Sequence, residues 1–393
     1  MALRYAVSLL ALPVFLGACA PPAPPVTPSS APAKPAADAP KAPPRADLPL
    51  APARAVTPPA LPVAAPITEP LPPLTRPFTL VTLPKVNDRL VSVTGRSDKD
   101  IFFLTDEEYS DKRHQHFVKK GALLRYDGKR VVGRIEPDCY GLQAHGVMVD
   151  PGGVILTGTN PFVRAPTVET AILGSDGKWK CNNNWTSVSA SPGDEAWALT
   201  CRSPEGHGCS LQAARGKKAA FPAYHARFGE HGASTPQQAR AWQMHGDDDG
   251  WMVLPDEAGK PWLWRWNGVS WTPKLPLDDL DLTGLWSSKG GVVWLVGTRG
   301  QSQSVVSYDG RAARALPVPE AFDARIAVGV GAEIWFLGGE RAYQLVGQRL
   351  HEGPSPFRVS DAWVAPSGEM WVVSNMAEKP GIVARVAPPR GSK

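Results

Sequence analysis

The stretch Leu263–Val296, which reads LWRWNGVSWTPKLPLDDLDLTGLWSSKGGVVWLV, decides the fold. It contains a strand, an Asn-Gly turn, a second strand, a proline-containing loop, a third strand, a glycine turn and an apolar fourth strand. Asn-Gly and Asp-Gly supply the positive φ angles that two-residue hairpins need. Short strands of this kind, separated by tight turns, are typical of an all-β protein built from repeated sheets.

Two signals of this stretch recur along the chain. A turn followed by an apolar strand occurs at 97–104, 150–158, 191–199, 247–253, 288–296, 330–337 and 366–373. A hairpin turn follows at 125–130, 174–179, 214–219, 265–271, 307–312 and 345–350. The apolar anchors from Ile155 to Trp371 are 36 to 54 residues apart, and a four-stranded propeller blade needs about 40–45 residues. The pattern therefore predicts a β-propeller.

The ends of the repeat region predict how the propeller closes. The last apolar strand is followed by IVARVA (382–387), which has no partner hairpin, and the region begins with an isolated alternating strand, FTLVTLP (78–84). We expect the N-terminal strand to complete the last blade, because this pairing removes free sheet edges. The sequence predicts seven four-stranded blades over 78–393, with six blades as the alternative if 201–240 is an insertion.

This region resembles the Trp-rich β-propeller repeats of bacteria. The best matches are RWNGVSW (265–271) and VVWLVGTRG (292–300), and the resemblance covers about 80–393. The turns are also similar to the Asp-box turns of sialidase-like propellers. However, SDGKW (175–179) lacks the Asp-box spacing, so the resemblance implies no sialidase chemistry.

The N-terminus indicates export. Residues 1–19 read MALRYAVSLLALPVFLGAC, with Arg4 ahead of a short apolar run. This run is shorter than the roughly 20 residues that span a bilayer, and it is typical of a secretory signal. It ends in Leu16-Gly17-Ala18-Cys19, which resembles the lipobox of bacterial lipoproteins. That resemblance implies a lipoprotein signal peptide over 1–18, acylation of Cys19 and a lipid anchor in the membrane. An ordinary signal peptide with a chance cysteine is the alternative.

The segment between Cys19 and the repeats has a different composition. Residues 20–77 hold 20 of the 42 prolines and no tryptophan, whereas all 14 tryptophans lie between 179 and 371. Proline removes backbone donors and favours extended geometry. We therefore predict that 19–77 is the acylated cysteine followed by a disordered Pro/Ala-rich stalk. By analogy with lipoprotein sorting, alanine rather than aspartate at position 20 favours the outer membrane, on its periplasmic or surface face.

The cysteines agree with an oxidising compartment. Without Cys19, four cysteines remain, which is an even number with three possible pairings. Cys201 and Cys209 flank a predicted hairpin and are candidates for one disulfide, which leaves Cys139 and Cys181 for the other. A zinc site is the alternative.

Three tryptophans are the candidate ligand-binding residues. Trp242, Trp286 and Trp363 each lie eight or nine residues before the anchor tryptophan of their blade, which predicts equivalent places on the innermost strands. Aromatic side chains around a propeller axis can stack on sugars or insert into a protein groove. The alternative is packing between blades.

Other polar clusters do not form a recognised site. His114 and His116 have metal-ligand character, but their stretch is typical of a solvated loop. The segment HGDDDG (245–250) lacks the spacing of an EF-hand loop and falls where other repeats have their polar turn. We identify no catalytic residue, no metal site and no cofactor.

These observations limit the function. A net charge of +5 over 393 residues argues against a nucleic-acid partner. We expect an envelope-anchored lipoprotein whose propeller is a non-enzymatic binding or scaffold module for another envelope protein or a glycan. The alternative is a hydrolase or lyase acting on a polysaccharide, which requires carboxylates or a nucleophile converging in a pocket.

Overall fold

The computed structural model divides the chain into two compact units, Met1–Val56 and Thr57–Lys393. The structure describes residues 61–106, 108–111, 116–119, 121–136, 143–150, 153–159, 168–174, 179–185, 187–189, 197–200, 210–213, 218–220, 241–245, 248–255, 260–268, 271–330, 332–374 and 380–389. All of them belong to the second unit, and the predicted signal peptide lies outside them. No helix in this part of the chain has the length and apolar character to cross a membrane.

The described residues form seven four-stranded antiparallel sheets, which we number in chain order. Sheet 1 contains β2 (Arg89–Ser97), β3 (Asp100–Asp106), β6 (Leu123–Tyr126) and β7 (Val131–Ile135). Sheet 2 contains β8 (Gln143–Asp150), β9 (Gly153–Thr159), β10 (Val168–Gly174) and β11 (Trp179–Trp185). Sheet 3 contains β12 (Ser187–Ser189), β13 (Trp197–Thr200), β14 (Ser210–Ala213) and β15 (Lys218–Ala220). Sheet 4 contains β16 (Ala241–Met244), β17 (Gly250–Pro255), β18 (Pro261–Trp266) and β19 (Trp271–Pro276).

The remaining sheets follow the same order along the chain, with one exception. Sheet 5 contains β20 (Asp281–Ser287), β21 (Val293–Arg299), β22 (Ser302–Tyr308) and β23 (Ala313–Leu316). Sheet 6 contains β24 (Ile326–Val330), β25 (Glu333–Leu337), β26 (Arg341–Val346) and β27 (Arg349–Pro354). Sheet 7 contains β28 (Asp361–Val364), β29 (Met370–Val373), β30 (Ile382–Val386) and β1 (Phe78–Thr82). The exception is β1, which pairs with β30, with Leu80 opposite Ala384.

The all-β fold predicted from the repeat is confirmed. The seven strands expected after a turn are β3, β9, β13, β17, β21, β25 and β29, the second strand of each sheet. The hairpin turns expected after them join the third and fourth strands of sheets 1 to 6. Between β3 and β6, the stretch expected to be a solvated loop contains a small hairpin, β4 (Glu108–Asp111) and β5 (His116–Lys119).

The Asp-Gly turns explain why the repeat uses these residues. Gly128 and Gly310 have φ angles of 89° and 90°, a backbone conformation that favours glycine. The carboxylate of Asp309 accepts hydrogen bonds from the amides of residues 311 and 312, at 2.9 and 2.8 Å. In the same way, the carboxylate of Asp127 accepts hydrogen bonds from the amides of residues 129 and 130. These amide hydrogen bonds lower the pKa of both aspartates below its ordinary value.

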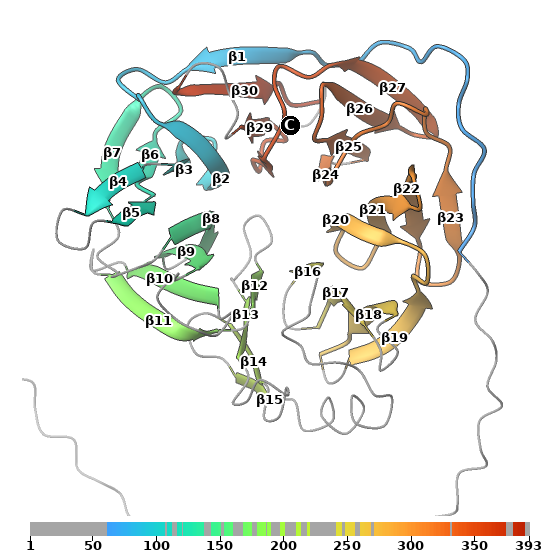
Figure 1. The fold of residues 1–393 in the computed structure, drawn as a ribbon, viewed down its shortest axis with the longest axis horizontal. Helices are drawn as coiled ribbons and strands as arrows, with labels where there is room; N and C mark the ends of the chain where they lie inside the picture. Colours follow the sequence, from blue (N-terminus) through green and yellow to red (C-terminus); the bar gives the residue numbers. More distant parts are fainter. Residues whose placement is uncertain are drawn as a thin grey trace, which may run out of the picture. The chain divides into compact units, whose positions relative to one another are not determined.

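The sheets are arranged about a common centre (Figure 1). The first strand of each sheet lies toward this centre and the fourth strand lies toward the periphery. First strands of several neighbouring sheets contact each other, as in β16 with β20, β20 with β24 and β24 with β28. β2 of sheet 1 also contacts β28 of sheet 7. These sheets therefore bury apolar side chains against neighbouring sheets, in cores shared by sheets 4 and 5, 5 and 6, 6 and 7, and 7 and 1.

The cores lie at the junctions between sheets, and the anchor tryptophans fill them. Trp371 of sheet 7 is 2% exposed and meets Tyr126 of sheet 1 edge to face, with ring centroids 5.7 Å apart. Trp251 of sheet 4 is 1% exposed and meets Tyr308 of sheet 5 in the same way, at 6.0 Å. Both tyrosines directly precede an Asp-Gly turn. The aromatic-Asp-Gly signal thus marks a turn and also the ring that packs on the neighbouring sheet.

Candidate functional site

Two of the predicted tryptophans pack between sheets. Trp286 and Trp363 lie on the first strands of sheets 5 and 7, each opposite the anchor tryptophan of its own sheet. Each indole covers a glycine on the first strand of the following sheet. A Cβ on Gly329 would lie 2.0 Å from Cζ2 of Trp286, and a Cβ on Gly95 would lie 2.6 Å from Cη2 of Trp363. This geometry favours the packing alternative, and ligand binding by these side chains stays a prediction.

Trp242 does not occupy the equivalent position. In sheet 4, Gln243 lies opposite the anchor Trp251, and Trp242 lies opposite Met252. Successive strand residues point to opposite faces, so a shift of one residue changes the face. The nine-residue spacing of Trp242 from its anchor, against eight for Trp286 and Trp363, is therefore a real difference.

In the junction between sheets 4 and 5, the position opposite the anchor tryptophan is taken by a polar side chain, Gln243, and not by a tryptophan. The side-chain oxygen of Gln243 accepts a hydrogen bond from the amide of Ser287 at 2.9 Å. The hydroxyl of Ser287 lies 2.6 Å from Nε2 of His245. A serine bonded to a histidine ring is the arrangement used in nucleophilic catalysis. Here both side chains are buried, with 1% and 5% exposure, so the pair joins two sheets and does not face a substrate.

Residues 246 and 247 of the segment 245–250 lie outside the described residues, and the residues on either side of them are hydrogen-bonded to each other. The amide of His245 donates to the carbonyl of Asp249 at 2.8 Å. The carboxylate of Asp249 accepts from the amide of Gly290 at 2.6 Å and lies 3.4 Å from the guanidinium of Arg265. It therefore bridges sheets 4 and 5. In the described ranges, no group of three or more His, Cys, Asp or Glu side chains is placed to hold a metal ion.

An aspartate whose carboxyl group is withdrawn from solvent connects sheets 7 and 1. Oδ2 of Asp361 accepts hydrogen bonds from the Ser92 hydroxyl at 2.5 Å and from the Val93 amide at 2.9 Å. Burial raises the pKa of this carboxyl above its ordinary value, because the charged form loses its solvent, and the hydrogen bonds offset part of this effect. The sequence analysis did not single out this residue.

The segment 61–77, which we call the strap, lies along the outer strands of sheets 5 and 6. Ile67 forms a parallel bridge with Pro319, and Pro73 forms one with Glu352 of β27. The amide of Ile67 donates to the carbonyl of Val318 at 3.0 Å. In Figure 1 this part of the chain passes β23 and β27 before it enters β1. The sequence analysis assigned 61–77 to the disordered stalk, but these residues belong to the folded body.

Aliphatic side chains of the strap reach three successive junctions. Leu61 packs against the core between sheets 4 and 5. Ile67 and Leu71 pack against the core between sheets 5 and 6, and Leu74 packs against the core between sheets 6 and 7. The strap therefore covers the outer ends of these junctions with apolar surface, which contributes about 25 cal/mol per Å² removed from water.

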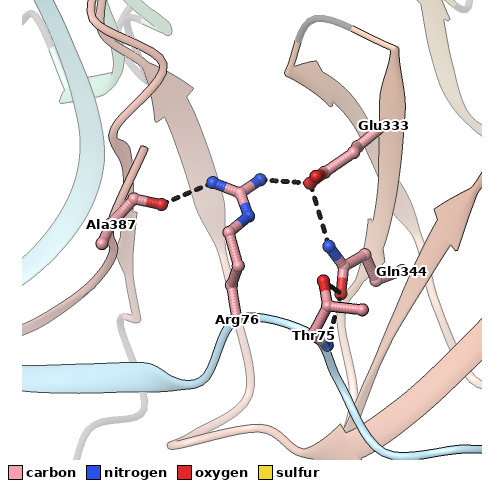
Figure 2. A network of polar contacts seen from close by, with 5 residues as sticks. All are labelled: Thr75, Arg76, Glu333, Gln344 and Ala387. Atoms are coloured by element: carbon pink, nitrogen blue, oxygen red, sulfur yellow. Dashed lines mark hydrogen bonds and ion pairs between the residues drawn. The ribbon is translucent and has the colours of Figure 1, made fainter. Parts of the chain in front are cut away.

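A polar cluster fixes the end of the strap (Figure 2). The guanidinium of Arg76 forms an ion pair with Glu333 of β25 and donates to the carbonyl of Ala387, near the C-terminus. Gln344 of β26 donates to the same Glu333 carboxylate at 2.9 Å and accepts from the amide and hydroxyl of Thr75, both at 2.9 Å. The side chains of Arg76 and Glu333 are 11% and 17% exposed. We call these five residues the Arg76 cluster.

A cavity of about 550 Å³ lies between the strap and sheet 5. Val63, Ala64 and Pro66 of the strap form one wall, and the rest is formed by Arg299 at the end of β21, by Gln301 in the next turn, and by residues of β22, β23 and the following loop. Its volume is within the range of about 300–1,000 Å³ that is typical of ligand pockets. This cavity is the candidate binding site.

Several predicted residues are not tested by these contacts. Cys19, Cys139, Cys201 and Cys209 lie outside the described residues, as does His114. Cys181 lies in β11, opposite Ala171 of β10. The lipid anchor and both disulfides therefore stay predictions.

Sequence reasoning missed the strap, although a signal was present. Large aliphatic residues are nearly absent between 20 and 47, where Val26 is the single example. They become frequent from 48 onward, first as Leu48, Leu50 and Val56 and then through the strap as Leu61, Val63, Ile67, Leu71 and Leu74. Proline content is similar in both parts, so the change in aliphatic residues was the informative feature.

Comparison with known proteins supports the fold. No family model and no curated protein matches the chain. Virginiamycin B lyase from Staphylococcus aureus aligns with 80% of this chain and 100% of its own, with a TM-score of 0.50 and 13% identity. YCF48 bound to D1 peptide aligns with 82% of this chain and 100% of its own, with a TM-score of 0.51 and 12% identity. These neighbours are β-propeller proteins. At such identities the likeness shows the fold alone, and the body of this chain has the β-propeller fold.

Proposed function

We propose that this chain is an envelope-anchored lipoprotein whose β-propeller is a non-enzymatic module that binds another envelope protein or a glycan. The seven sheets are the seven blades of a ring, which β1 closes by pairing with β30. The contact between β2 and β28 and the pairing of Leu80 with Ala384 support this ring.

The strap is the observation that carries the proposal. The lipobox-like Leu16-Gly17-Ala18-Cys19 precedes a proline-rich segment, and the described part of the body starts at Leu61 and runs along the outer strands of sheets 5 and 6. The Arg76 cluster then joins the strap to sheet 6 and to the C-terminal end of sheet 7. A tether attached in this way leaves the body intact under load and presents its surfaces to partners.

The buried polar groups support a binding role over catalysis. His245, Asp249 and Asp361 each make hydrogen bonds between two neighbouring sheets. Their chemistry is thus used to join sheets, and an enzyme needs such groups to converge on a substrate. One neighbour of the same fold, YCF48, is bound to a peptide. This is consistent with a propeller surface that recognises a protein segment.

Affinity capture tests the binding role. The full-length lipoprotein with a C-terminal tag is purified from detergent-solubilised envelope, and co-purifying proteins are identified by mass spectrometry. A matched sample of the Arg76→Met chain, in which the strap is weakened, is the control for contacts that depend on the strap. We expect a stoichiometric envelope protein. Absence of any partner, together with cleavage of envelope polysaccharide by the same preparation, would replace the proposal with the hydrolase or lyase alternative.

Metabolic labelling tests the anchor. We expect incorporation of radiolabelled palmitate into the wild-type chain and recovery of the protein in the outer-membrane fraction. Cys19→Ala removes the acylated thiol, so the label and the membrane association should both be lost. Label that persists in Cys19→Ala would contradict the lipoprotein assignment.

A further inference from the structure

One edge of each sheet carries the turns that join its first strand to the second and its third strand to the fourth, because the strands are antiparallel. In sheets 5, 6, 7 and 1 these edges face the same way. The Ser367 hydroxyl, in such a turn of sheet 7, donates to the carboxylate of Asp98, in such a turn of sheet 1, at 2.6 Å. The next residue of the same turn lies beside Val330 of sheet 6, and Trp286 covers Gly329 near the same ends of β20 and β24. We call the surface formed by these edges the turn face.

Exposed cationic side chains follow the turn face through sheets 1, 5 and 6. Each of them lies in one of these turns or directly after it, and together we call them the basic crescent: Lys99, Lys129, Lys289, Arg311 and Arg349. In the part of the chain that the structure describes, none of the five forms an ion pair with a carboxylate. Their charges are therefore available to a partner.

The carboxylates beside the crescent do not cancel its charge. Asp127 and Asp309 are used within their own turns, where each accepts two amide hydrogen bonds. Each also has a second arginine nearby, Arg130 at 3.9 Å from Asp127 and Arg314 at 3.7 Å from Asp309. Both turns thus carry two cationic side chains against one carboxylate, which leaves a net positive charge.

This charge is confined to one region of the surface. In sheet 7, Glu369 pairs with Arg385 at 3.2 Å, so that sheet adds no net charge between sheets 6 and 1. In sheet 4, the turn face has an exposed carboxylate, Asp248. The opposite face carries both signs, as in the loop between β23 and β24, where Glu320 and Arg325 are both exposed. The positive region is therefore the turn face of sheets 5, 6 and 1.

The layout of the crescent favours a broad anionic surface over a compact ligand. Its residues stand near the outer strands β7, β23 and β27, and β7 and β23 lie on opposite sides of the arrangement in Figure 1. None of the five belongs to the lining of the cavity beside the strap. No aromatic ring is among the exposed large hydrophobic side chains of the described residues, so the stacking surface that sugars use is not provided.

We propose that the turn face docks, through the basic crescent, on a membrane surface that carries anionic phospholipid headgroups. Clustered lysine and arginine side chains are attracted to such surfaces, and their contributions add up over several residues. The inference rests on the proposed lipid anchor, which keeps the body within reach of a membrane. Labelling of Cys19 tests that anchor separately.

Sedimentation with lipid vesicles tests the inference. The full-length lipoprotein is held in nanodiscs of phosphatidylcholine, which take up its lipid anchor, and is mixed with dense vesicles. The probe vesicles contain equal parts of phosphatidylcholine and phosphatidylglycerol, and vesicles of phosphatidylcholine alone are the blank. Lys129→Gln and Arg311→Gln each remove one charge of the crescent. Lys85→Gln is the matched control, because Lys85 is exposed between β1 and β2, on the opposite face.

We expect binding to the anionic vesicles that weakens as salt is added, because salt screens exposed charges. The Kd should rise about three- to five-fold in Lys129→Gln and in Arg311→Gln, and about ten- to twenty-fold in the double variant. Lys85→Gln should leave Kd unchanged, and circular dichroism melting confirms that each variant folds. Equal binding to the two kinds of vesicle would overturn the inference, as would equal Kd values for Arg311→Gln and Lys85→Gln.

Three further outcomes would assign the crescent differently or leave it without a partner. Heparin that binds more tightly than the anionic vesicles, with the same dependence on Arg311, would overturn the choice of a membrane in favour of an anionic polysaccharide. An acidic envelope protein captured by wild type and lost in the double variant, with no vesicle binding, would overturn it in favour of a protein. A partner retained by the double variant, again with no vesicle binding, would overturn the inference and leave the proposed function intact.

Discussion

Two junctions, between sheets 7 and 1 and between sheets 4 and 5, can be compared. Toward the periphery both contain the same kind of aromatic contact, whereas toward the centre their contacts differ. In the first, Trp371 packs edge to face on Tyr126, and in the second Trp251 packs on Tyr308. Toward the centre, an indole covers Gly95 in the first junction. In the second, Gln243 forms hydrogen bonds to the neighbouring sheet.

This difference separates two roles within one repeat. The aromatic pair next to the Asp-Gly turn is the same in both junctions, so it supplies the general attraction between neighbouring sheets. The residues on the first strands vary from one junction to the next. Their chemistry therefore differs from junction to junction. Substitutions in the aromatic pair and substitutions in the first-strand residues can measure separately how much each group contributes to stability.

The largest effect is expected from the shared aromatic pair. Trp371→Ala should lower the free energy of unfolding by about 3–5 kcal/mol, because it leaves a large cavity in the core between sheets 7 and 1. Urea denaturation measures this loss. Val132→Ala, at a position 48% exposed, is the control and should change stability by about 0.5 kcal/mol or less. A loss below about 1 kcal/mol in Trp371→Ala would contradict the shared role.

A smaller loss is expected where an indole covers a glycine. Gly329→Ala places a methyl group 2.0 Å from Cζ2 of Trp286 and should destabilise the protein by about 1–3 kcal/mol. Gly133→Ala is the control, because its nearest neighbouring atom would lie 3.9 Å away. In a Trp286→Leu background the effect of Gly329→Ala should fall. If it does not fall, the clash with the indole is not the cause.

Asp361 gives the junction between sheets 7 and 1 a dependence on pH. Its folded-state pKa is raised above the ordinary value of 3.8 by burial. The stability from this group is therefore complete below the unfolded pKa and declines as pH rises through the folded pKa. The free energy of unfolding of the wild type, taken relative to that of Asp361→Asn, should fall as the pH is raised from 4 to 8. A difference that is independent of pH would contradict the raised pKa.

The smallest effect is expected from the polar junction. Ser287→Ala removes the hydroxyl that lies 2.6 Å from the His245 ring and should cost about 1 kcal/mol. Ser302→Ala, on the exposed end of β22, is the control and should be neutral in the same denaturation experiment. A loss as large as that of Trp371→Ala would mean that the two halves of a junction contribute equally.

Local signals predicted the sheets, because each depends on neighbouring residues. Asp-Gly turns, apolar strands and their spacing gave the second, third and fourth strands of most sheets before any contact was known. The register of Trp242 was wrong by one residue, since a small change in turn length moves a side chain to the other face. The spacing of nine residues rather than eight was the sign of this change.

Contacts between distant segments were beyond these signals. Arg76 and Glu333 are 257 residues apart in the chain, and Ser92 and Asp361 are 269 apart. No local pattern pairs such residues, because they belong to different sheets that meet only in the folded protein. The candidate binding site, the cavity between the strap and sheet 5, was missed for the same reason, since its walls come from 63–66 and from 299–320. The high proline content of 20–77 also concealed the aliphatic residues that hold the strap in place.

The strap determines how a mechanical force enters the molecule. A pull on the chain ahead of Leu61 acts first on the carbonyls held by Arg299, then on the bridge at Ile67 and then on the bridge at Pro73. The force reaches β1 after the Arg76 cluster has yielded. The seventeen residues of the strap, about 55 Å of extended chain, would therefore detach from the outer strands one contact at a time. The pairing between β1 and β30 is therefore the last of these contacts to carry the load.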